Sequence, residues 1–218
     1  MAAGDDGPQT RVMTRALIVI DVQESFAARP LWRHTSNPDI VADVNQLVGH
    51  ARAQGDLVIW VLHAKPGSGG PFDPESGLVR YQDGLEPLPG EPQLRKTSHN
   101  VFTTTNLGQL LTERSVRELV ICGIQTEQCC ESTARLAYDL GYTVTFVIDA
   151  TATNPIAHRD LVLELGGEPP TVEQVLADPR TLGTDQILER VEYALAGRFA
   201  RIATVAEMVT EKADAGPW

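Results

Sequence analysis

Short apolar runs alternate with amphipathic segments along the chain, which is the pattern of an α/β fold. Apolar runs of strand length occupy residues 14–23, 56–64, 115–124, 142–150 and the stretch that begins at 198. Segments with apolar side chains at helical spacing lie between them, at 40–54, 105–114, 127–140 and 184–196. Because nearly continuous apolar strands are buried on both faces, the pattern predicts a parallel sheet with helices on both sides.

The helix at 40–54 has the clearest boundaries. Asp39 precedes it as the expected N-cap, and Gly55 follows its last turn.

Two stretches depart from this alternation. Residues 65–92 are dense in glycine and proline, and a connection of this length in a compact domain is usually a lid or binding loop. Residues 158–183 show no clear period, and we interpret them as an inserted helix and loop. Since there is no internal repeat or break in composition, we expect one domain over 14–212, after a flexible leader at 1–13.

Composition narrows the classes of function. The chain has 218 residues and a formal net charge of −11, which argues against partners such as nucleic acid or an anionic membrane. No apolar run indicates a transmembrane helix, and the polar start of the sequence lacks the apolar core of a secretory signal. The three cysteines are odd in number and clustered, so they do not suggest a disulfide framework. We therefore expect a cytoplasmic protein.

Candidate chemistry gathers where the predicted strands end, because ligands of parallel sheets bind outside the carboxyl ends of the strands. Cys129 lies at the start of the helix predicted at 127–140, where free N–H groups and the helix dipole favour a thiolate. Its neighbour Cys130 points about 100° further around the helix. We expect Cys130 and the strand residue Cys122 to be core residues.

A carboxylate and a cation could complete such a site. Asp21 ends the first predicted strand and could accept the thiol proton as a general base. A carboxylate alone would raise the pKa of the thiol, so a cation is required, and Lys96 is the candidate. From position alone, structural roles remain open: Asp21 as a turn cap, Lys96 as a surface group, and Cys129 as an apolar filler.

Three segments resemble the signatures of the isochorismatase-like cysteine hydrolases. This family includes nicotinamidases, carbamoylsarcosine amidohydrolases, maleamate-type amidases and the isochorismatases proper. The segments occur in the family's order: LIVIDVQESF, RKTSHNVFTTTNL and ICGIQTEQCCESTARLAYDLGYTVTFVIDATAT. The resemblance covers most of residues 14–153. It implies a three-layer, Rossmann-like αβα fold with a mainly parallel sheet of about six strands.

The resemblance also assigns roles to residues. It implies that Asp21 is the acid–base residue, Lys96 the active-site lysine and Cys129 the nucleophile. It further implies a cis peptide bond between Ile124 and Gln125, with the N–H groups of Gln125 and Cys129 forming an oxyanion hole.

Two further positions of the motifs concern the substrate. Phe26 is part of a Gln-x-x-Phe pattern and is a candidate substrate contact. Gln125 stands where the family more often has a small residue, so we expect it to shape the pocket or hydrogen-bond a polar substrate.

The activity implied is cysteine-dependent hydrolysis of a C–N bond in a small amide or carbamoyl compound, through a thioester intermediate. Two alternatives stay open: a vinyl-ether hydrolase of the isochorismatase type, and a non-catalytic binding protein on the same fold. Vinyl-ether cleavage needs the aspartate but no thiol, so Cys129 favours the amidase. A binding protein has no reason to keep Asp21, Lys96 and Cys129 together.

Metal and partners are the remaining expectations. Nicotinamidases hold a divalent ion through an Asp-x-His pair, but here Val61 stands two residues before His63. We therefore predict no metal and no other cofactor, and interpret His63 as a strand-end residue bonded to backbone or as a pocket wall. Because family members commonly associate, we expect a homodimer or homotetramer. The 158–183 insertion would then cap the pocket or pack on a partner subunit.

Overall fold

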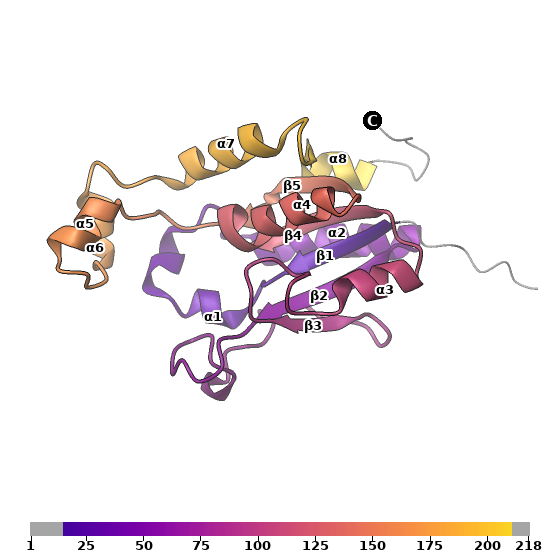
Figure 1. Ribbon diagram of the computed structural model, residues 1–218, viewed down its shortest axis with the longest axis horizontal. Helices are drawn as coiled ribbons and strands as arrows, with labels where there is room; N and C mark the ends of the chain where they lie inside the picture. The colour runs from indigo at the N-terminus through magenta and orange to yellow at the C-terminus, as the bar shows by residue number, and fades with distance from the viewer. Residues whose placement is uncertain (1–14, 211–218) are drawn as a thin grey trace, which may run out of the picture.

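The computed structural model describes residues 15–210, which form a six-stranded sheet in which every pair of neighbouring strands is parallel. The spatial order is β3-β2-β1-β4-β5-β6, and Figure 1 labels β3, β2, β1, β4 and β5 in that order. The strands are β1 (Arg15–Ile20), β2 (Leu57–His63), β3 (Gln93–Lys96), β4 (Glu118–Ile124), β5 (Thr143–Ala152) and β6 (Arg201–Ala203). The predicted fold class is confirmed, and the sheet has the expected six strands.

Helices cover both faces of the sheet, as the apolar strands require. One core joins β-strand side chains such as Ile18 and Ile121 to α3 (Leu107–Glu113), α4 (Glu131–Asp139) and α7 (Thr184–Leu195). The other core joins Val19 and Val120 to α2 (Ile40–Gln54) and α8 (Val205–Thr210). The remaining short elements are α1 (Glu24–Ala27), α5 (Arg159–Glu164), α6 (Val172–Ala177), the 3-10 turns η1 (Pro30–His34) and η2 (Pro74–Ser76), and the π-helical turn η3 (Thr126–Cys130).

Two details differ from the sequence-based expectations. Strand β3 was not among the predicted strands, because its residues QLRK are mostly polar and only Lys96 is buried. Asp39 occupies the N-cap position of α2, but its side chain makes no capping hydrogen bond. The Asn37 side chain instead accepts the N–H of Asp39 at 2.9 Å.

The two unusual stretches lie at the carboxyl ends of the strands. The Gly/Pro-rich connection after β2 is held against α1 by backbone hydrogen bonds such as Ser25 N to Leu78 O, at 3.1 Å. The segment 158–183 forms α5 and α6 rather than one helix, and Figure 1 shows them as an arm beyond the sheet. The expected leader at 1–13 lies outside the described residues. None of the described helices is long and apolar enough to cross a membrane.

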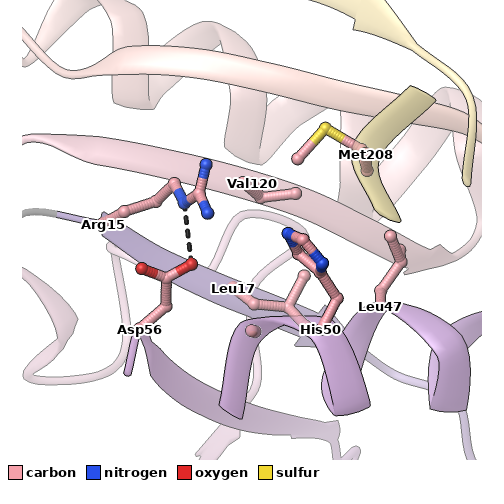
Figure 2. A pocket seen from close by; sticks show the side chains of 8 residues that line it. Arg15, Leu17, Leu47, His50, Asp56, Val120 and Met208 are labelled. Carbon is pink, nitrogen blue, oxygen red and sulfur yellow. Dashed lines mark hydrogen bonds and ion pairs between the residues drawn. The ribbon is translucent and has the colours of Figure 1, made fainter. Parts of the chain in front are cut away.

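A small cavity lies at the amino end of the central strands, between the start of β1, α2 and α8 (Figure 2). Arg15 and Asp56 form an ion pair at 2.7 Å beside it, and His50 of α2 borders it. Its volume of about 10 Å³ leaves space for about one water molecule and is too small for a substrate. A substrate site is therefore expected at the carboxyl ends of the strands and not at this cavity.

Gly123 lets β4 approach β1 closely at the point where the catalytic candidates gather. Its φ is +126°, and a Cβ atom there would lie 1.9 Å from the carbonyl oxygen of Ile20. We expect Gly123→Ala to destabilise the protein by about 3 kcal/mol or more, because overpacking and an unfavourable φ act together. Urea unfolding would measure the loss. Gly108→Ala in α3 is the matched control, since no atom lies within 4 Å of the added Cβ. Equal unfolding midpoints for the two variants would contradict this close approach.

Candidate active site

Three elements bring Asp21, Lys96 and Cys129 into contact. Asp21 directly follows β1, Lys96 ends β3, and Cys129 lies in η3 after β4. The Nζ atom of Lys96 is 2.6 Å from Oδ2 of Asp21 and 3.2 Å from Sγ of Cys129. Asp21 and Lys96 are 0% exposed and Cys129 is 5% exposed. The three residues singled out from sequence therefore form one buried cluster.

Asp21 is positioned by a sharp change in backbone direction at the end of β1. Its φ is 55°, in the left-handed region that aspartate tolerates better than most residues. Burial raises the pKa of its carboxyl to about 6, against the opposing effect of the Lys96 charge. Its Oδ1 atom has no hydrogen-bond partner in the part of the chain that the structure describes. A buried carboxylate with a free oxygen and a pKa near neutrality can accept and return a proton.

Lys96 is the cation at the centre of the cluster. Its ammonium also approaches His63 Nδ1 at 3.1 Å and the carbonyl of Ser98 at 3.2 Å. Burial would lower the pKa of this lysine, but the negative charge of Asp21, together with hydrogen bonds to Asp21 and Cys129, outweighs that effect and raises it. Lys96 is therefore a fixed positive charge and not a proton donor at neutral pH.

Cys129 differs from the sequence-based expectation in its protonation. Burial is the largest effect and raises the pKa of its thiol, and the Asp21 charge raises it further, while Lys96 only partly opposes them. The expectation that the helix start stabilises a resting thiolate was therefore wrong. The resting group is a thiol, and its proton must leave during any reaction at sulfur. Cys130 and Cys122 are fully buried in the two cores, as predicted.

The peptide bond between Ile124 and Gln125 is cis. The carbonyl of Gln125 accepts the N–H groups of Gln128 at 3.2 Å and Cys130 at 3.1 Å. Ile124 is fully buried in the core and is not among the residues that line the pocket described below. Phe26 is also buried, and its ring lies 4.9 Å from that of Phe72. Phe26 thus supports a residue that lines the pocket described below.

His63 and Gln23 belong to the cluster in a way that the sequence did not indicate. The Gln23 side chain accepts the backbone N–H of His63 at 2.7 Å and donates to its carbonyl at 3.0 Å. Burial, followed by the charge of Lys96, lowers the pKa of His63 to about 4. The neutral ring can therefore accept a hydrogen bond from Lys96. Both residues lie in or beside recognisable motifs, but only the pairing of β2 with β3 brings His63 to Lys96.

The arrangement suits an ammonium better than a metal ion. Asp21, His63 and Cys129 each offer a donor atom, and these atoms lie within 4.8 Å of one another. Lys96 Nζ approaches all three at 2.6 to 3.2 Å, so the ammonium takes the place where a cation would bind. A second positive charge there would be repelled. We therefore keep the prediction that no metal binds here, and the Lys96 ammonium is the structural reason for it.

A pocket of about 890 Å³ opens beside this cluster. Gln125 connects the two, since it lies four residues before Cys129 and lines the pocket. Phe72 also lines the pocket, and its ring is 5.7 Å from that of His63. The Gly/Pro-rich connection and the 158–183 insertion both contribute walls. The lining residues are Arg29, Pro30, Leu31, Lys65, Phe72, Gln125, Gln128, Asn154, Pro155, Ile156, Ala157, Pro169, Pro170, Thr171, Val172, Glu173 and Val175.

Comparison with known proteins identifies the family to which this fold belongs. The family model described as the isochorismatase domain matches residues 15–166. The chain is 36% identical over 144 residues to a streptothricin hydrolase of Streptomyces noursei, covering 65% of this chain and 56% of that enzyme. It is 31% identical over 170 residues to ureidoacrylate amidohydrolase RutB of Enterobacter sp. (strain 638), covering 62% of this chain and 74% of that enzyme. A crystal structure of an isochorismatase from Pseudomonas putida KT2440 is 31% identical, with a TM-score of 0.74 and 93% of each chain covered.

Proposed function

The chain belongs to the isochorismatase family and is a hydrolase of that family, and we propose that it cleaves C–N bonds through a thioester on Cys129. The substrate would be a small amide or carbamoyl compound. The observation that carries this proposal is the buried contact of Lys96 with both Asp21 and Cys129. One relative is named an amidohydrolase, which supports the same type of bond.

In the proposed acylation step, Sγ of Cys129 attacks the carbonyl carbon while the thiol proton passes to Asp21. The N–H groups of Gln125 and Cys129 would stabilise the oxyanion. The C–N bond then breaks, Asp21 returns the proton to the leaving nitrogen, and ammonia or an amine departs. A thioester remains on Cys129.

In the proposed deacylation step, water attacks the thioester carbonyl and gives a proton to Asp21. The C–S bond breaks, the acid product leaves, and the proton returns to sulfur. Lys96 keeps its positive charge throughout and offsets the single negative charge that moves from Asp21, through the attacking sulfur, to the substrate oxyanion and back. This order of steps is compatible with a resting thiol whose pKa is raised, because Asp21 accepts the proton only as the C–S bond forms.

The quaternary structure and the cellular location remain part of the proposal. We propose a homodimer or homotetramer in the cytoplasm. Exposed apolar side chains on the outer helices support the association, among them Tyr193 of α7 at 76% and Leu163 of α5 at 70% exposure. Sedimentation velocity would measure the mass in solution.

An ammonia-release screen of small amides and carbamoyl compounds tests the function. For a compound that is turned over, kcat/KM should fall about tenfold per pH unit below about pH 6, because protonated Asp21 cannot accept the thiol proton. His63, with a pKa of about 4, and Lys96, with a raised pKa, keep their charge states from pH 5 to 9. Intact-mass analysis should detect the acyl group on Cys129. Activity that stays constant from pH 7 to 5 would exclude Asp21 as the base. Cleavage of vinyl ethers without acylation would favour the alternative hydrolase.

A further inference from the structure

We propose that the 890 Å³ pocket binds a carboxylate of the substrate through Arg29, so that the preferred substrates are amides or carbamoyl compounds with an anionic end. This inference rests on the proposed function and adds the substrate class. It starts from a cation in the pocket wall that has no close partner of its own.

Arg29 is held in place by its backbone. Its N–H donates to the carbonyl of Phe26 at 2.9 Å, and its carbonyl accepts the N–H of Trp32 at 2.9 Å. The side chain is half-buried and lines the pocket. Among residues 15–210, its guanidinium forms no ion pair or side-chain hydrogen bond. Its one described side-chain interaction is the longer-range attraction of Glu127. A half-buried guanidinium without a bound acceptor is suited to a carboxylate ligand, which it can bind in a bidentate manner.

The other charges around the pocket support an anionic ligand. Lys65 lines the wall contributed by the Gly/Pro-rich connection and adds a second positive charge. Glu173 is the one acidic side chain in the lining, and it interacts with the hydroxyl of Thr171 and with backbone at the start of α6. Within the lining, Arg29 and Lys65 therefore outnumber Glu173, although the chain carries a net charge of −11 and Glu127 attracts Arg29 from outside the lining.

Asn154 adds a matching hydrogen-bond acceptor. Its side chain is 3% exposed in total, and its Nδ2 donates to the carbonyl of Leu31 at 2.9 Å, which fixes the amide orientation. Its Oδ1 has no hydrogen-bond partner within the described residues. A buried unpaired acceptor is costly, and a substrate N–H would satisfy it. Arg29 and Asn154 together describe a ligand that combines a carboxylate with an amide or ureido N–H.

The test compares acid monoamides with neutral diamides of the same length. The probes are the monoamides of succinate and glutarate, with succinamide and glutaramide as their neutral counterparts. For the wild type, kcat/KM should be at least about tenfold higher for a monoamide. Arg29→Gln should lower that value by about 10- to 100-fold through KM and change the diamide less than about threefold. Arg33→Gln is the matched control, because Arg33 lies on the same turn, is exposed and does not line the pocket.

A binding measurement separates this inference from the proposed function. Calorimetry with the monoamides on Cys129→Ala removes the chemistry and keeps Arg29. When Arg29→Gln is added to the Cys129→Ala variant, monoamide binding should weaken at least about tenfold. Adding Arg33→Gln to the same variant should leave monoamide binding unchanged. The inference would be overturned if the enzyme hydrolysed diamides as well as monoamides, or if monoamide binding did not depend on Arg29. The proposed hydrolase function would still stand in either case. Arg29-dependent binding without hydrolysis or acylation of Cys129 would support the anion site and count against the proposed function.

Discussion

Replacing Cys129 with alanine is expected to lower amide hydrolysis by roughly four orders of magnitude or more, because the variant cannot form the thioester. The change removes one sulfur atom at a buried site and should cost only about 1 kcal/mol of stability, so the fold should persist. Ammonia release at pH 7.5 would measure the rate, and circular dichroism would check the structure. The acyl group found on the wild type by mass spectrometry should be absent from the variant.

Cys130→Ala is the natural control for this experiment. Cys130 is equally small and lies next in sequence, but it is fully buried in the core formed with α3, α4 and α7. Its replacement should cost about 1 kcal/mol of stability, as core truncations commonly do, and should leave kcat within a small factor of the wild type. If Cys129→Ala kept its ammonia release, amide hydrolysis would not pass through a thioester on this residue, and the proposed mechanism would be wrong.

Lys96→Met is expected to impair both the reaction and the fold. Without the ammonium, the negative charge on Asp21 and the developing charge on Cys129 lose their counterion, and we expect a rate loss of about 10²- to 10³-fold. Removing one partner of a buried ion pair typically destabilises a protein by about 3–5 kcal/mol, because the other charge is left unpaired. The ammonium contacts Asp21 at 2.6 Å with both side chains fully buried, so that penalty applies here.

The stability loss of Lys96→Met should depend on pH. The pKa of Asp21 is already raised above its ordinary value by burial, and removing Lys96 removes the charge that opposes this rise. A carboxyl with a raised folded-state pKa favours folding at low pH, and this contribution is lost as pH rises through that pKa. Lys96→Met should therefore lose more stability between pH 5 and 8 than the wild type does.

Urea unfolding at pH 5 and pH 8 would measure this difference. Lys65→Met is the stability control, since Lys65 is exposed and its loss should change the free energy of unfolding by less than about 0.5 kcal/mol. Equal stability of Lys96→Met and the wild type at both pH values would show that the Asp21–Lys96 pair is not buried in solution.

The sequence contained most of the fold, because alternation of apolar runs and amphipathic segments reflects burial directly. The helix predicted at 40–54 has those bounds in the structure, and four of the five predicted strands are long and nearly continuously apolar. Strand β3 lacked such a signal, since an edge strand of four mostly polar residues is specified by pairing with β2 and not by its own burial.

The grouping of Asp21, Lys96 and Cys129 could be predicted from sequence, because the three motifs contain these residue types in a characteristic order. Their protonation could not be, since it depends on burial and on distances between residues far apart in the chain. The raised pKa of the Cys129 thiol, the neutral His63 beside Lys96 and the ammonium at the centre of the donor atoms all follow from tertiary packing. The same holds for the pocket, where Arg29, Lys65 and Asn154 come from loops after three different strands. Sequence determined which groups this protein carries, and tertiary structure decided which charges they hold and what they face, because desolvation and Coulomb interactions act through space.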